Sequence, residues 1–74
     1  MAPPLTQTVD VRDMVCAQAL ALVARAMRRL RVGVRLRVLY NAEDVKRDVL
    51  VWAKDGGHLA ADEAPSVLQI ARGR

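Results

Sequence analysis

Two stretches of the chain alternate apolar and polar residues with a period of two, and this pattern predicts β-strands. In the stretch from Thr8 to Arg12, Val9 and Val11 share one face, and Asp10 lies on the other. The longer stretch from Val34 to Tyr40 alternates in the same way, so its apolar side chains would line one face. We expect both strands to belong to a sheet that is covered on one side.

Two further stretches repeat apolar residues at intervals of three and four, which predicts amphipathic helices. The first helix is expected from Ala17 to Leu30 and the second from Ala42 to Lys54. Asp13 and Asn41 are the expected N-caps, because their side-chain oxygens can accept hydrogen bonds from the free amides of a first turn. Gly33 would end the first helical stretch.

The rest of the pattern completes a fold prediction. Short strands are expected over His58 to Asp62 and Ser66 to Ala71, with a turn near residues 63–65 between them. The order βαβαββ predicts an α/β (α+β) two-layer sandwich, in which two helices cover one face of a four-stranded mixed sheet. Residues 1–7 have two prolines and no periodicity, so we expect a flexible tail there and a single domain over residues 8–74.

Composition limits the classes of protein that this chain can belong to. Its 74 residues suffice for one domain with a small core, which excludes a separate substrate-binding lobe. Phe is absent, and Trp52 and Tyr40 are the only aromatic residues, so aliphatic side chains must fill the core. No apolar stretch approaches the ~20 residues of a membrane span, and no signal-like segment opens the chain. A soluble, cytoplasmic protein that does not enter a membrane is expected.

The charge is +4, and six arginines lie between Arg25 and Arg37. Such a cluster can meet RNA, an acidic protein surface or an anionic small molecule, and it is also typical of a solvated helix face. RNA is the weakest of these alternatives, because a sheet that stacks bases shows several exposed aromatic residues. Both aromatic residues here fall on predicted core stripes.

Cys16 is the only cysteine, and it lies where the first strand gives way to the first helix. A helix N-terminus lowers the pKa of a thiol, which would make Cys16 a sulfur nucleophile. Cys16 also shares a stripe with Leu20 and Val23, which is typical of an inert core cysteine, and the nearby Asp13 would disfavour a thiolate. Both interpretations stay open on this pattern.

Other catalytic or metal chemistry finds little support in the sequence. Cys16 and His58 are the only soft or borderline metal ligands, and a structural zinc site needs about four, so no metal is expected. No third residue completes an acyl-transfer set with them. His58 follows a Gly-Gly turn and is expected to be partly exposed, with or without a role.

The chain resembles the TusA-like (SirA-like) sulfur carrier family, whose first motif reads D-x-R-G-L-x-C-P-x-P. Asp10, Arg12 and Cys16 match this motif. The resemblance extends from about Val9 to Arg72 and includes Gly33, the R-D-I position at residues 47–49 and the G-H position at residues 57–58. The departures are an Asp for the motif glycine, a Met for the motif leucine, the run C-A-Q-A for C-P-x-P, and Ala-Glu at residues 42–43 where D-P is usual.

The resemblance implies a small sulfur carrier of sulfurtransferase type that needs no cofactor. Cys16 would hold a persulfide, received from a cysteine desulfurase or rhodanese-type donor and passed to an acceptor protein, and the chain would act as a monomer. The candidate supporting or partner-docking residues are Asp10, Arg12, Asp13, Arg25, Arg28, Arg29 and His58. The alternative is a divergent, non-catalytic module that binds a protein or, less favoured, RNA. An enzyme with its own small-molecule turnover ranks third.

Overall fold

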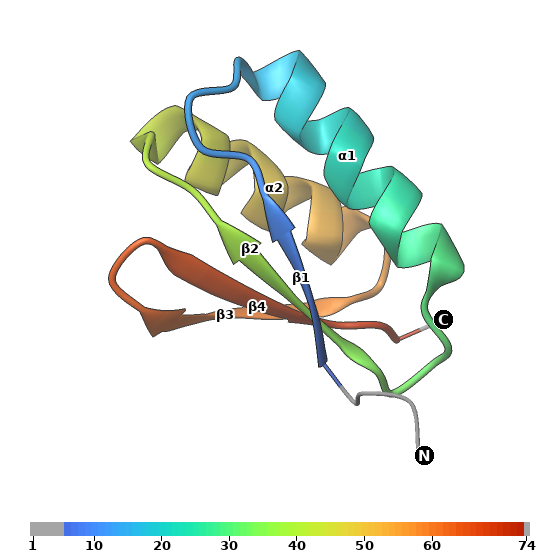
Figure 1. The fold of residues 1–74 in the computed structure, drawn as a ribbon. Coiled ribbons are helices and arrows are strands. Elements are labelled where there is room, and N and C mark those ends of the chain that lie inside the picture. The colour runs from blue at the N-terminus through green and yellow to red at the C-terminus, as the bar shows by residue number, and fades with distance from the viewer. Residues whose placement is uncertain (1–5, 74) are drawn as a thin grey trace.

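Four strands form one mixed sheet, and two helices cover one of its faces (Figure 1). The computed structural model describes residues 6–73. The elements are β1 (Thr6–Asp10), α1 (Cys16–Arg29), β2 (Arg35–Leu39), α2 (Glu43–Asp55), β3 (Leu59–Ala64) and β4 (Val67–Ala71). This order, the mixed sheet and the helical layer confirm the predicted two-layer sandwich.

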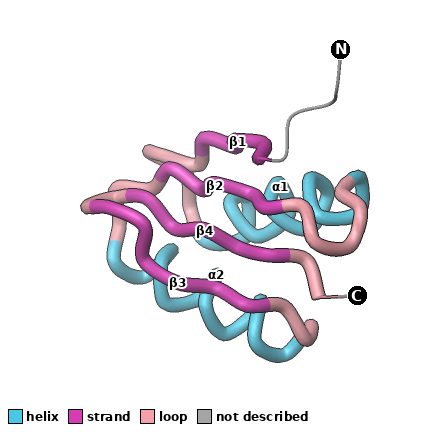
Figure 2. The backbone as a smooth tube through the Cα atoms, turned by 90° about the horizontal axis from the view of Figure 1, so that it is seen from below, coloured by secondary structure: helices cyan, strands magenta, loops and turns pink. Residues whose placement is uncertain are grey.

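The strands lie side by side in the order β1-β2-β4-β3, as Figure 2 shows. β1 pairs with β2 in parallel, and β4 pairs antiparallel with both β2 and β3. Since β1 and β2 end at the same edge of the sheet and each is followed by a helix, both helices begin at that edge. Figure 1 shows the start of α1 and the start of α2 there.

The core lies between the sheet and the helices and is aliphatic apart from Tyr40. It consists of Val11, Ala19, Val23, Met27, Leu30, Leu36, Val38, Tyr40, Val45, Val49, Ala53, Leu68 and Ile70. Alternate residues of the second strand and both helical stripes contribute to it, as predicted. Trp52 is only partly buried, at the margin of this cluster.

Several element bounds differ from the prediction. Residues 1–5 of the expected tail lie outside the described residues, whereas Thr6 and Gln7 belong to β1, so this strand begins earlier than predicted and ends at Asp10. β3 continues to Ala64, and the turn before β4 is formed by residues 65–66, with Ser66 at φ 63°. The pairing of β3 with β4 extends this strand over Glu63 and Ala64, which the pattern placed in the turn.

Both predicted N-caps are wrong. The N-caps are Val15 for α1 and Ala42 for α2, and neither makes a side-chain capping hydrogen bond. Asp13 and Asn41 bond to each other instead: the Asp13 amide donates to Asn41 Oδ1 (2.9 Å), and Asn41 Nδ2 donates to Asp13 Oδ1 (2.7 Å). This reciprocal pair joins the two loops that lead into the helices.

The C-terminal end of α1 is held by an arginine from the end of the chain. Arg72 Nη1 donates to the carbonyl oxygen of Met27 at 2.8 Å and to that of Leu30. The Met27 carbonyl also accepts from the amide of Leu30, which is the C-cap of α1. Arg72 therefore ties the segment after β4 to the last turn of α1.

Candidate thiol site at the start of both helices

Cys16 is the first residue of α1, at the sheet edge where β1 and β2 end. Its side chain packs against the core cluster but is only half-buried, and it forms no disulfide. The residue before it, Val15, is 65% exposed. The thiol therefore combines both features predicted from its sequence position, a core-facing stripe and partial access to solvent.

Two carboxylates of α2 face the thiol. Cys16 Sγ donates to Asp44 Oδ2 across 3.6 Å, and Asp48 lies one turn further along α2. Hydrogen bonding to Asp48, loss of hydration and then hydrogen bonding to Asp44 raise the pKa of Cys16 to about 11, and the negative charges of both carboxylates add to the shift. The thiol is therefore protonated at neutral pH.

This pKa shift is opposite to the lowering expected from a helix N-terminus alone. Two nearby negative charges and partial burial outweigh the positive end of the helix dipole, whose effect on an exposed group is modest. Sequence reasoning considered Asp13 as the acid near the thiol and missed Asp44 and Asp48. A signal was present: parallel strands followed by helices bring two helix starts to one edge, and Asp44 and Asp48 are spaced by four residues on one helix face.

The segment between β1 and α1 is fixed by an ion pair. Arg12 donates from Nη2 to Asp10 Oδ2 at 2.8 Å and from Nε to Asp10 Oδ1 at 3.0 Å, and its backbone amide also donates to Asp10 Oδ1. The hydrogen bonds from Arg12 lower the pKa of Asp10 to about 2. Asp10 and Arg12 thus engage each other and shape the loop that carries the thiol.

A family model described as Sulfurtransferase TusA matches residues 7–70. The chain belongs to this family. The membership confirms the resemblance carried by Asp10, Arg12 and Cys16, and it implies a sulfur carrier role in general terms. Comparison with curated proteins and comparison with solved structures give no significant match.

Within the TusA family motif, Asp13 stands in the place of a glycine, and its backbone shows why glycine suits that place. Asp13 has φ 62°, in the left-handed region that favours glycine. Asp and Asn tolerate this region better than other residues with a side chain. The hydrogen bonds with Asn41 help to hold Asp13 in this conformation.

The first turn of α1 forms without the two prolines of the TusA motif. Ala17 and Ala19 occupy their places, and the Ala19 amide donates to the Val15 carbonyl at 3.0 Å. A proline at residue 19 would lack this amide, so the present sequence gains one helical hydrogen bond. Ala19 is fully buried against the core.

The arginines predicted as docking residues lie away from the thiol. Arg25 follows Cys16 by nine residues of α1, which is about 14 Å along the helix axis, and Arg29 by about 20 Å. Arg28 and Arg29 are in the last turn of α1, and all three are exposed. The charges that act on Cys16 are therefore those of α2.

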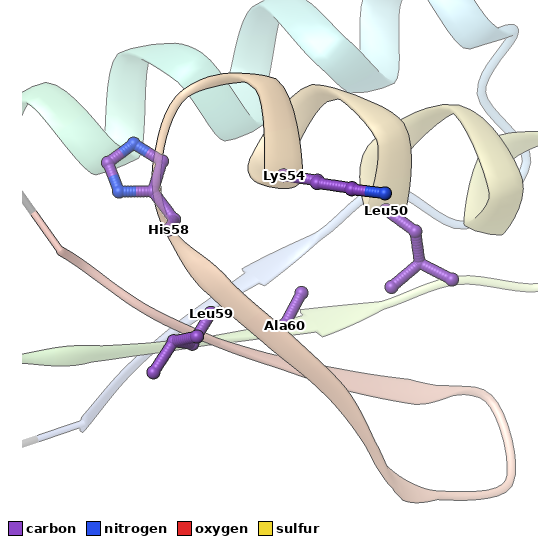
Figure 3. Close-up of a pocket in the computed structure, with 5 residues that line it drawn as sticks. All are labelled: Leu50, Lys54, His58, Leu59 and Ala60. Atoms are coloured by element: carbon purple, nitrogen blue, oxygen red, sulfur yellow. The ribbon is translucent and has the colours of Figure 1, made fainter.

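His58 lies beyond the last turn of α2, whereas Cys16 faces its first turns. Its Nδ1 accepts from the Gly73 amide (3.1 Å), and its ring is 5.6 Å from that of Trp52. With Leu50, Lys54, Leu59 and Ala60 it lines an open hollow of about 340 Å³ (Figure 3).

The polar groups of this hollow do not converge. The Lys54 ammonium and the His58 ring point to different ends of it (Figure 3). Over residues 6–73 no group of three or more His, Cys, Asp or Glu side chains could hold a metal ion, and no helix there is long and apolar enough to cross a membrane.

Proposed function

We propose that this TusA-family chain relays sulfane sulfur on Cys16 between two proteins. The donor carries a persulfide, as cysteine desulfurases and rhodanese-type proteins do, and the acceptor presents a nucleophile. The observation that supports this best is the position of the thiol: the one cysteine of the chain occupies the motif cysteine of the family, half-buried at the first residue of α1.

The transfer needs no cofactor and no net oxidation. Cys16 loses its proton, and its sulfur attacks the outer sulfur of the donor persulfide. The new S–S bond forms as the donor S–S bond breaks, and the donor leaves as a thiolate that takes up a proton. In the second half, the acceptor nucleophile attacks the outer sulfur on Cys16, and the Cys16 thiolate leaves and regains its proton.

The half-buried position of Cys16 suits both halves of this reaction. Packing against the core fixes the direction of Sγ. The transferred sulfur would be bonded to Cys16 Sγ at about 2.05 Å and would therefore lie further from the core than Sγ does. Arg12, Asp13 and the exposed arginines of α1 are candidates for contacts with the two partner proteins.

The test is mass spectrometry of the intact protein after incubation with a cysteine desulfurase, its cofactor and cysteine. The expected result is a gain of one sulfur atom that maps to the Cys16 peptide and is removed by a reductant. Cys16→Ser, with a matched oxygen nucleophile, should gain none. An unmodified native protein, under conditions in which a known carrier is loaded, would contradict the proposal.

A non-catalytic binding module is the second candidate, and the protonated state of Cys16 favours it. A thiol whose pKa is raised to about 11 is a slow nucleophile in the free protein. In that case Cys16→Ala would keep every partner interaction and every cellular activity, whereas the carrier function requires that sulfur delivery be lost with the thiol.

A further inference from the structure

Among residues 6–73, the carboxylates of Asp44 and Asp48 beside the thiol form no ion pair with a positively charged side chain. Among residues 6–73 the ion pairs are Arg12 with Asp10, Arg37 with Glu63 and Lys46 with Asp62. Lys46 is a close neighbour in sequence, yet it binds Asp62 of β3 at 3.2 Å. Two negative charges therefore face Cys16 without a balancing cation among the described residues.

We propose that Asp44 and Asp48 hold Cys16 in its protonated form in the free protein, and that a positively charged group on the docking surface of a sulfur partner releases it. This inference rests on the sulfur carrier function proposed above and adds the chemistry of the partner surface. Asp44 and Asp48 act through Cys16 and are positioning residues. The partner that fits this edge is basic, in contrast to the acidic partner that fits the arginines of α1.

The size of the effect follows from the thiolate population. With its pKa raised to about 11, Cys16 is a thiolate in about one molecule in 10⁴ at pH 7, against about one in 10² at the ordinary value of 9.0. A cation that cancelled the effect of both carboxylates would raise this population by less than 100-fold, because loss of hydration also contributes to the shift in pKa. Because a less basic thiolate is also a weaker nucleophile, with a Brønsted coefficient of about 0.4–0.5, the net gain in rate is at most about tenfold.

Docking and activation are then the same event. A cation that approaches Asp44 and Asp48 is attracted by both carboxylates and, once in contact, weakens their hold on the proton of Cys16. By reciprocity, a partner of this kind binds the thiolate form more tightly than the thiol form. The free carrier is protected from adventitious electrophiles, because these bring no such cation.

Asp44 could act instead as a general base, since its Oδ2 accepts the Cys16 hydrogen bond. The two roles predict opposite changes in the rate of attack by Cys16 when the charge of Asp44 is removed. A base is needed for the reaction, so its loss slows every attack by Cys16. A carboxylate that holds the thiol protonated does the opposite, and its neutralisation speeds the attack.

The test uses Asp44→Asn, Asp48→Asn and the double variant, in which shape is kept and charge is removed. Mixed-disulfide formation at Cys16 is followed with three small disulfides: cationic cystamine, neutral hydroxyethyl disulfide and anionic dithiodiglycolate. In each reaction the Cys16 thiolate attacks one sulfur, and the other half leaves as a thiolate that takes up a proton. Rates are measured from neutral to alkaline pH.

Glu43→Gln is the matched control, because Glu43 is exposed in the same first turn of α2 and does not contribute to the pKa shift of Cys16.

The native protein should favour cystamine over dithiodiglycolate more strongly than the double variant does; this comparison is needed because the pKa of the leaving thiol alone gives the three disulfides different rates. The double variant should react faster with the neutral disulfide at pH 7, by at most about tenfold, with its midpoint moved below pH 11, and should show a smaller preference for the cation. Glu43→Gln should match the native protein. Circular dichroism checks the fold of each variant, and Asp44→Asn alone, at an exposed residue, keeps the comparison available if Asp48→Asn unfolds.

The same ratio of the cystamine rate to the dithiodiglycolate rate in the native protein and the double variant, or an unchanged midpoint in a folded Asp44→Asn variant, would overturn the inference. Slower reaction of the variants would assign the base role to Asp44. No persulfide enters these measurements. The failure of the sulfur carrier function, seen as an absence of added sulfur, is thus distinguishable from the failure of this inference.

Discussion

The two ends of α1 are finished in opposite ways. At the C-terminal end, a guanidinium from the other end of the chain donates to carbonyl oxygens of the last turn, and Arg28 and Arg29 add positive charge. At the N-terminal end, Val15 offers no side-chain cap, and a thiol faces two carboxylates. The C-terminal end of α1 is therefore stabilised by hydrogen bonds and charge, whereas at the N-terminal end two carboxylates disfavour the thiolate of Cys16. The stability of this helix and its chemistry are therefore located at different ends.

The carboxylate of Asp44 stabilises α2 and also disfavours the thiolate of Cys16 on α1. It lies in the first turn of α2, where a negative charge interacts favourably with the helix dipole, as does Glu43. The same charge lies next to Cys16 because the two helices start at one edge of the sheet. A residue that stabilises one helix thereby sets the protonation of a group on the other.

The largest effect on stability is expected at the C-terminal end of α1. Arg72→Met keeps the aliphatic part of the side chain but removes the donors to Met27 and Leu30, and it should lower the free energy of unfolding by about 2–3 kcal/mol, since hydrogen bonds from charged groups are worth about 1.5–3 kcal/mol. Urea denaturation measures the change. Arg25→Met, at an exposed residue of α1, is the control and should change stability by less than about 0.5 kcal/mol. Equal losses in both variants would show that Arg72 does not cap α1.

A smaller gain in stability is expected from a substitution at the N-terminal end of α1. Val15 has the extended backbone of an N-cap (φ −76°, ψ 159°) and is exposed, so Val15→Ser should add a capping hydrogen bond at no cost to the core. The expected gain in the free energy of unfolding is about 0.5–1 kcal/mol. Val15→Ala, which adds no acceptor, should lie close to the native protein in the same thermal and urea measurements. A serine variant no more stable than the alanine variant would contradict the expected capping hydrogen bond.

The smallest effect concerns the loop before α1. The pKa of Asp10 is about 2 in the folded protein, against an ordinary value of 3.8, so the unfolded chain binds the proton more readily between these two pH values. The stabilisation by Asp10 is thus complete above about pH 4 and is lost as the pH falls toward 2. NMR titration of the Asp10 carboxyl should show the low midpoint, and Arg12→Met should return it toward 3.8. Because both side chains are half exposed, only a slight change in stability accompanies it.

The fold was predictable because its signals are local. Alternation placed Leu36, Val38 and Tyr40 on the buried face of β2, and the three-four spacing placed Val45 and Val49 on the buried stripe of α2. These periods report which side faces the core, whatever covers it.

The predicted caps failed because a non-local partner competed for the same side chains. Asp13 and Asn41 are 28 residues apart, and each satisfies the other in place of a helix amide. Residue spacing alone does not reveal such a pair.

The site was predictable in one residue and not in its surroundings. The motif identified Cys16, but the pKa of its thiol depends on Asp44 and Asp48, which are brought to it by the packing of α2 beside α1. The helix rise alone already separates the arginines from the thiol, since Arg29 lies near the far end of α1. Charge is therefore segregated along α1, a fact that a net charge of +4 conceals.

The strand order β1-β2-β4-β3 also has a consequence for the path by which the chain folds. β3 and β4 are joined by a two-residue turn, so their pairing closes a short loop, whereas β1 meets β2 only after the whole of α1 has been spanned. Contacts that close short loops form sooner, because they lose less chain entropy. We expect the hairpin and α2 to assemble first and β1 to dock last at the edge of the sheet. Cys16 would then reach its place beside α2 in the final step of folding.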